Sequence, residues 1–135
     1  MRIVEHDALE SYSIAGIEHR TLAAARDGLS DLEVWDDLLY PGAATGLCRH
    51  DCEKVILVLA GSGQLQLEHE ARVFAAPCSL IVPRGRLHGL SNTGDRVMSL
   101  ITVFAATPLG TFATDGAPVE LPWHSALAPG AERPR

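Results

Sequence analysis

Turn signals built from glycine and proline interrupt this sequence at short intervals, and their spacing limits what the chain can fold into. The 12 glycines and 8 prolines are spread along the whole chain. Between the turns lie short segments rich in β-branched residues and leucine, and these segments predict strands at 54–60, 63–68, 79–82 and 97–104. Many short strands separated by turns are typical of an all-β sandwich or barrel.

The predicted strands differ in how many of their faces are expected to be buried. The segment 63–68 alternates polar and apolar residues, which indicates one wet face and one dry face. The segment 55–60 is apolar throughout, which suits a strand that is buried on both faces. Between them, Gly-Ser-Gly at 61–63 predicts a hairpin turn. The segment 21–26 is compatible with either a short helix or the edge of a strand.

Length, charge and cysteine content bound the class of protein. The chain has 135 residues, 47% of them hydrophobic, which predicts one domain over 1–135 with a loose tail at about 125–135. Its net charge of −6 argues against nucleic acid or an anionic membrane as a partner. No apolar run approaches the ~20 residues of a membrane span, and no signal peptide is visible. The three cysteines have no paired spacing, so we expect a protein of the reducing cytoplasm.

Polar and sulfur-containing side chains occupy alternate positions just before the first predicted strand. Alternate residues of a strand point to the same side, so these side chains share a face with the apolar residues that follow. The residues on this face are Cys48, His50, Cys52, Lys54, Ile56 and Val58. The pattern predicts a polar patch at one end of an apolar interior.

A second segment, 83–92, supplies another histidine. Pro83 ends a predicted strand, Gly85 permits a tight bend, and His88 then begins the next strand. Asn92 opens the following turn. Because two separate hairpin regions each present a histidine, we expect His50 and His88 to converge on one site.

The spacing in both segments resembles that of the cupins. The first cupin motif is G-x5-H-x-H-x3-E-x6-G, and its positions are held here by Gly42, Cys48, His50, Lys54 and Gly61. The second motif is G-x5-P-x-G-x2-H-x3-N, and its positions are held by Pro77, Pro83, Gly85, His88 and Asn92. On these motifs, at 42–61 and 77–92, the chain is identified as a small single-domain cupin of the RmlC-like jelly-roll family. The resemblance implies a double-stranded β-helix and a homodimer.

The resemblance also implies a metal site, with two departures. Cupins usually hold one divalent metal with the two histidines and the glutamate of the first motif and the histidine of the second, which implies His50 and His88 as ligands. Cys48 replaces a histidine; it is either a thiolate ligand suited to zinc or copper(I), or a buried thiol. Lys54 replaces the glutamate, and an ammonium has no lone pair to give a metal. Lys54 is therefore either paired with a carboxylate or a catalytic amine.

Three functions remain open at this point. The first is a small-molecule-binding protein in which Cys48, His50 and His88 hold a divalent transition metal: zinc, nickel, iron or copper. The second is a metal-free isomerase or cyclase in which His50, His88 or Lys54 transfers a proton. The third is a ligand-binding or sensing module without chemistry. We favour the first, and the sequence does not decide whether the protein is an enzyme.

The remaining candidates are expected to be structural. Cys52 and Cys78 are expected to be structural, and Cys52, in the turn 50–53, is only a weak candidate ligand. His69 is expected to be solvated, and Trp123 and His124 are expected to cover a strand edge or a barrel mouth. Core or dimer-face positions are expected for Trp35, Tyr40 and Phe104. The arginines that flank the motifs are expected at the rim, and these are Arg49, Arg84 and Arg86.

Overall fold

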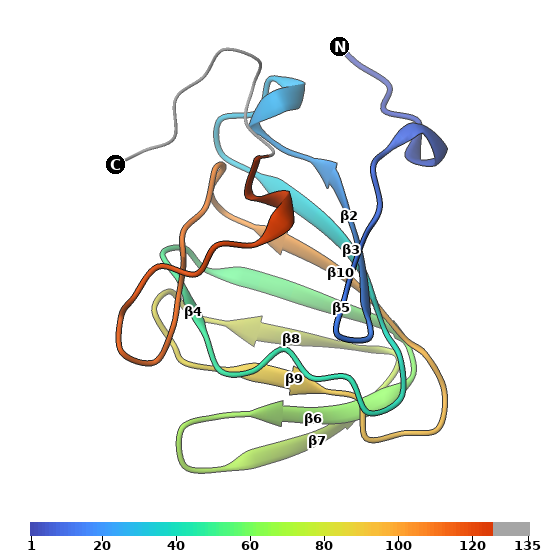
Figure 1. Ribbon diagram of the computed structural model, residues 1–135, viewed down its shortest axis with the longest axis vertical. Coiled ribbons are helices and arrows are strands. Elements are labelled where there is room, and N and C mark those ends of the chain that lie inside the picture. The colour runs from blue at the N-terminus through green and yellow to red at the C-terminus, as the bar shows by residue number, and fades with distance from the viewer. Residues whose placement is uncertain (126–135) are drawn as a thin grey trace.

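The computed structural model describes residues 1–125, and this part of the chain is built almost entirely from antiparallel strands (Figure 1). The strands are β1 (Tyr12–Ile14), β2 (Ile17–Ala23), β3 (Glu33–Leu39), β4 (Arg49–His50), β5 (Lys54–Ala60), β6 (Ser62–Gln66), β7 (Ala71–Ala75), β8 (Cys78–Val82), β9 (Gly89–Ser91), β10 (Met98–Phe104) and β11 (Thr111–Phe112). Three short 3₁₀ helices complete the fold, η1 (His6–Ala8), η2 (Ala25–Asp27) and η3 (Pro122–Ser125). The all-β prediction is confirmed, and no helix in the described part is long and apolar enough to span a membrane.

Two sheets enclose the interior. The larger has the strand order β1-β2-β3-β10-β5-β8, and the smaller has the order β7-β6-β9 (Figure 1). Isolated bridges from Ala44 to Ser91 and from Cys48 to His88 attach the segment 44–48 to β9 and so extend the smaller sheet. β4, which follows that segment, pairs in turn with β11. This is the double-stranded β-helix, or jelly roll, that the resemblance implied.

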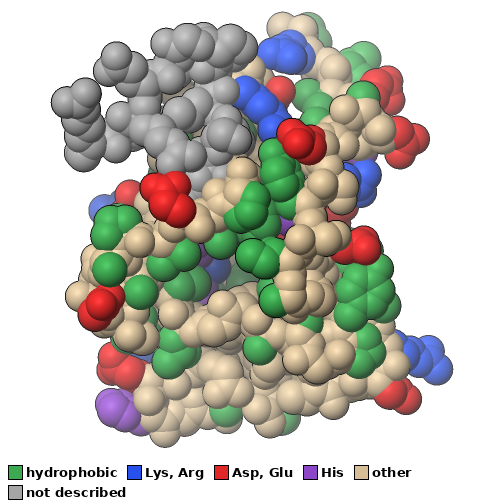
Figure 2. Space-filling model, viewed as in Figure 1, with side chains coloured by type: hydrophobic (Ala, Val, Ile, Leu, Met, Phe, Trp, Pro, Cys, Tyr) green, Lys and Arg blue, Asp and Glu red, His purple; other side chains and the backbone are tan. Residues whose placement is uncertain are grey.

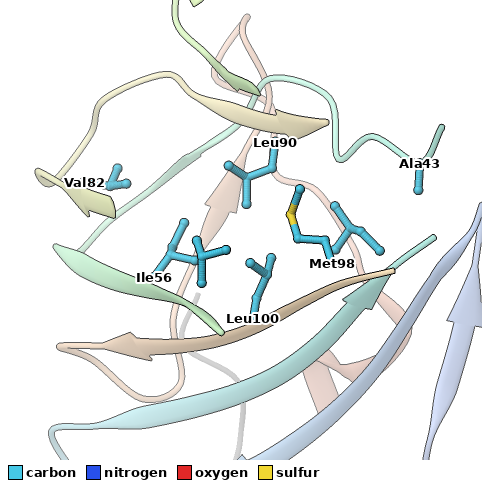
Figure 3. Packing of buried hydrophobic residues seen from close by; sticks show 8 residues of the cluster. Ala43, Ile56, Val82, Leu90, Met98 and Leu100 are labelled. Atoms are coloured by element: carbon cyan, nitrogen blue, oxygen red, sulfur yellow. The ribbon is translucent and has the colours of Figure 1, made fainter. Parts of the chain in front are cut away.

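Strand alternation decides which side chains enter the space between the sheets. β3 and β10 alternate strictly between buried and half-buried residues along their seven positions. The apolar members from both sheets meet in one cluster, in which the side chains point toward one another (Figure 3). The cluster consists of Leu39, Ala43, Ile56, Val58, Val82, Leu90, Met98 and Leu100. Four of its members, Leu39, Ile56, Leu90 and Leu100, also line the cavity described below.

One local prediction is wrong, and one segment with two predicted alternatives contains both. The segment 61–63 is not a hairpin turn, because β5 pairs with β10 and β8 whereas β6 pairs with β7 and β9. Gly61, at φ +91°, instead carries the chain from one sheet to the other. The segment 21–26 is divided, since its first residues end β2 and its last belong to η2. The predicted tail lies almost entirely outside the described residues.

Gly61 is a position where both the backbone conformation and the close packing favour glycine. A Cβ at this residue would lie 2.8 Å from Met98 Cα, in addition to the strain of a positive φ. We expect Gly61→Ala to lower the free energy of unfolding by about 2–4 kcal/mol, combining backbone strain with overpacking. The measurement is urea denaturation. Gly42→Ala is the matched control, because Gly42 has φ +86° and open space around it. An equal loss in both variants would show that the contact with Met98 is unimportant.

Candidate functional site

The two motif segments meet through a backbone pair. Cys48 N donates to His88 O at 2.9 Å, and His88 N donates to Cys48 O at 3.0 Å, so the two residues lie directly opposite each other. The turn before His88 is held against β4, because Gly85 N donates to His50 O at 3.0 Å. Gly85 has φ +76°, which allows this turn to bend sharply. The predicted convergence of the two hairpin regions is thus present in the fold.

Three potential metal ligands come together at this pairing. One ligand atom from each of Cys48, His50 and His88 lies within 4.8 Å of the others. The imidazole rings of His50 and His88 have their centroids 5.9 Å apart. In a tetrahedral zinc site, ligand atoms lie about 2.0–2.3 Å from the ion, so modest side-chain movements would bring all three into range. The donor set fits such an ion and leaves one coordination position open.

Hydrogen bonding orients both imidazoles. His88 Nδ1 lies 2.8 Å from the carbonyl oxygen of Arg86. A carbonyl only accepts, so Nδ1 carries the proton and Nε2 keeps its lone pair, as a metal ligand requires. His50 Nδ1 lies 3.2 Å from Thr111 Oγ1, and the ring meets Phe104 edge-on at 5.1 Å between centroids. The imidazoles are therefore positioned for ligation before any metal binds.

The protonation of His88 and Cys48 follows from burial. Burial, followed by the charge of Lys54, lowers the pKa of His88 to about 4, so the ring is neutral at pH 7. Burial raises the pKa of the Cys48 thiol, and Lys54 opposes that shift. Without a metal, Cys48 is therefore a thiol, and metal binding must displace its proton.

Lys54 places a cation on the wall of the same interior. The residue is only 9% exposed, and its Nζ lies 5.4 Å from the centroid of the Phe104 ring. Burial lowers the pKa of Lys54 to about 8, and nearby Cys48 and Asp37 act in the opposite direction. Among residues 1–125 no carboxylate forms an ion pair with it, so the predicted carboxylate partner is absent from that part of the chain. At pH 7 the amine is mainly charged, and Lys54 lines the cavity described next.

These groups share one cavity of about 240 Å³ between the sheets. In the space-filling view, hydrophobic side chains surround a hollow in the face of the molecule (Figure 2). Its lining combines the polar groups Cys48, His50, Lys54, His88 and Asp37 with Trp35, Phe104, Trp123 and several aliphatic residues. A mostly apolar cavity with a few convergent polar groups is the usual form of a small-molecule site.

Several cavity residues lie outside both motifs and were not predicted from the sequence, and Asp37 is the most important of them. Asp37 is 9% exposed and lines the cavity, and its Oδ1 lies 2.6 Å from His19 Nδ1. The signal was present in the segment 33–39, where every second residue is buried. An aspartate in step with Trp35 and Leu39 could have been recognised as facing inward.

Other candidates lie away from the cavity. Cys52 lies two residues before Lys54, so a regular strand would place both side chains on the same face. A bend separates β4 from β5, and Cys52 packs instead in a cluster with Trp35, Phe104 and Trp123. All three cysteines are free thiols. Tyr40 is 39% exposed and does not belong to the core, whereas Trp35 and Phe104 do, and His69 is exposed as expected. The rim arginines do not line the cavity, and the side chain of His124 lies outside the described part.

The lowered pKa of His88 predicts acid sensitivity of the metal-free protein. Between pH 6.5 and 4 the unfolded chain binds a proton at His88 that the native state does not, so stability falls as the pH drops through that window. We expect a loss of about 2–3 kcal/mol from pH 7 to 4.5, measured by urea denaturation. His88→Gln should remove most of this loss, whereas His69→Gln, at an exposed histidine, should keep it. The same loss in wild type and His88→Gln would contradict the assignment.

Solved structures resemble this fold along nearly its whole length. The polyketide cyclase RemF from Streptomyces resistomycificus superposes with a TM-score of 0.70 and 20% identity, covering 92% of this chain and 89% of that one. A protein with a double-stranded β-helix domain from Klebsiella pneumoniae gives a TM-score of 0.69 and 19% identity, covering 90% of this chain and 99% of that one. At this identity the likeness concerns the fold alone.

Sequence comparison is more specific. Auxin-binding protein 1 of Arabidopsis thaliana is 29% identical over 114 residues, 76% of this chain and 57% of that protein. Auxin-binding protein T85 of Nicotiana tabacum is 30% identical over 120 residues, 78% of this chain and 63% of that protein. The chain thus spans less than two thirds of the length of these curated relatives. The auxin binding protein family matches residues 2–116. The chain belongs to this family and is a small single-domain cupin.

Proposed function

We propose that the protein binds a small organic anion inside its barrel, beside a divalent transition metal held by Cys48, His50 and His88. The observation that carries the proposal is the meeting of these three ligand atoms, within 4.8 Å of one another, on the wall of the cavity between the sheets. The curated relatives are named for auxin binding. From these relatives we infer for this chain only that a small ligand binds in the barrel, and auxin is one candidate ligand.

The donor set indicates which metal the site prefers. A thiolate with two imidazoles suits zinc, and nickel, iron and copper are weaker alternatives. When bound, such an ion would offer an open position to an oxygen of the ligand. Lys54 opposes the ion, since a unit charge and a dication 4 Å apart repel by roughly 8 kcal/mol at an effective dielectric of 20. A structural zinc site gains about 10–16 kcal/mol, so the ligands outweigh this repulsion.

The charges around the cavity indicate the ligand. Lys54 is a buried cation that forms no ion pair with a carboxylate of residues 1–125, and burying a charge without a counter-charge is costly. An anionic group of the ligand would relieve this cost. The apolar part of the ligand would then lie against Trp35, Phe104 and Trp123.

A second candidate function is metal-free proton transfer. The observation that favours it is the amine of Lys54, whose pKa of about 8 lies near neutrality, in the same cavity as the neutral His88. Groups with shifted pKa values in a cavity are typical of acid–base catalysis. The metal content of the purified and reconstituted protein distinguishes the two candidate functions.

The metal proposal is tested by elemental analysis of protein purified without an affinity tag and then reconstituted with zinc. We expect about one equivalent per chain, because three ligands give a tight site. Cys48→Ser should reduce retained zinc at least tenfold, as one ligand is removed. Cys78→Ser is the control, since Cys78 is a half-buried thiol outside the ligand group and should retain zinc. Less than about a tenth of an equivalent in the wild type would reject the metal and favour proton transfer.

We further propose that the protein is a homodimer joined through the outer face of the larger sheet. β8 is the edge strand of that sheet, and Ile81 on it is 69% exposed, with Leu59 of the neighbouring β5 at 58%. Apolar side chains exposed on the outer face of a sheet are typical of an interface.

Sedimentation velocity tests the dimer. The 14.4 kDa chain should sediment at twice its mass, and Ile81→Glu should shift it to the monomer by placing a charge in the interface. Val73→Glu is the control, because Val73 is 80% exposed on the other sheet and should leave the dimer intact. A wild-type chain that sediments as a monomer at micromolar concentration would refute the proposal.

A further inference from the structure

We propose that Lys54 is a site of covalent modification, where the amine reacts with carbon dioxide to form a carbamate that serves as a further ligand of the metal. The reactant is dissolved carbon dioxide, and the product is a carboxylate carried by the lysine side chain. The inference rests on the proposed metal site at Cys48, His50 and His88. It goes beyond that site, because it turns a residue that opposes the metal into one that binds it.

Lys54 is the only lysine of the chain, and it is buried beside the three metal ligands. It is 9% exposed and lines the same cavity as Cys48, His50 and His88. Its Nζ lies 5.4 Å from the centroid of the Phe104 ring, and the His50 imidazole meets that ring edge-on at 5.1 Å between centroids. The amine and the ligand group are therefore neighbours around one aromatic ring.

The unmodified ammonium is poorly matched to this environment. No carboxylate of residues 1–125 forms an ion pair with it. Asp37 lines the same cavity, but its carboxylate pairs with His19 at 2.6 Å and not with Lys54. A dication held by the three ligands would repel the ammonium, and such repulsion is strong where water is excluded. A buried cation with no counter-charge and a like-charged neighbour is unfavourable on both counts.

Carbamate formation reverses the charge of the side chain. The neutral amine nitrogen of Lys54 attacks the carbon of carbon dioxide, so that an N–C bond forms and the electron pair of one C=O π bond moves to its oxygen. The nitrogen then loses a proton to solvent. Counted from the ammonium, two protons are released, and no oxidant or reductant is consumed. Burial favours the neutral amine, which is the form that reacts.

The carbamate suits the coordination position that the three ligands leave open. Zinc is usually four-coordinate in proteins, and a carboxylate oxygen is one of its ordinary ligands. The flexible four-carbon stem of lysine allows the added group to bend toward the ion. An anion beside a dication is stabilised, so zinc and carbon dioxide should each strengthen the binding of the other. The proposed organic anion needs the ammonium form of Lys54 and therefore competes with the modification.

Carbon-13 NMR of the zinc-loaded protein in labelled bicarbonate, at pH 8, detects the adduct directly. We expect a carbamate resonance that appears only with zinc and is absent from Lys54→Met. Because the chain has one lysine, the N-terminus is the only other amine that can form a carbamate, and its signal should not depend on zinc. No zinc-dependent resonance in the wild type, or one that persists in Lys54→Met, would overturn the proposal.

Zinc affinity with and without carbon dioxide gives a second readout, measured by competition with a chelating dye. Bicarbonate should tighten zinc binding by the wild type about 10-fold or more relative to buffer free of carbon dioxide, because a ligand is added. Lys54→Glu carries a permanent carboxylate at this position and should bind zinc equally well in both buffers. Lys54→Met should also show no response. A response that survives in Lys54→Met would mean that bicarbonate itself occupies the open position, which would contradict the role of Lys54.

The outcomes separate this inference from the proposed metal site. Zinc that binds the wild type equally tightly in both buffers would overturn the carbamate and leave the metal site standing. Folded protein that binds no zinc in either buffer would overturn the metal site and the carbamate together. If Lys54→Met does not fold, the zinc dependence of the wild-type resonance and the bicarbonate response of Lys54→Glu still decide the matter.

Discussion

The site depends on the backbone pair between Cys48 and His88. Two mutual hydrogen bonds hold residues 40 positions apart in the chain directly opposite each other, and they close the smaller sheet onto the segment that enters β4. This pairing aligns the side chains of the two motifs on one wall of the interior. Without it, the cysteine and the histidine would belong to separate hairpins, and neither His50 nor Lys54 would face the second histidine.

The electrostatics of the interior follow from what this arrangement buries. A lysine, an aspartate and two histidines are buried around one cavity, with Lys54 and Asp37 too far apart to pair with each other. Burial lowers the pKa of His88 and of Lys54 and raises that of Cys48, which leaves a neutral imidazole, a thiol and an ammonium at neutral pH. Burying these groups is costly, and the proposed ligand and ion would offset that cost.

The sequence predicted those features of the fold and site that depend on the spacing of residues along the chain. The positions of His50 and His88 in the two motifs, and the parity of Lys54 with Ile56 and Val58, were sufficient to predict a shared polar patch in an apolar interior. Spacing could not show where a strand is interrupted. The bend after His50 removes Cys52 from the patch, and the turn at Gly61 joins two sheets where a hairpin was predicted. Asp37 was missed because it belongs to neither motif and only its alternation with Trp35 marks it.

The most direct test of the account is X-ray absorption spectroscopy at the zinc edge of the reconstituted protein. We expect one sulfur neighbour at about 2.3 Å and two imidazole nitrogens at about 2.0–2.1 Å. That combination would require Cys48, His50 and His88 to converge on one ion as the cavity geometry indicates. A spectrum with only nitrogen and oxygen neighbours would show that the thiol is not part of the site and would contradict the account.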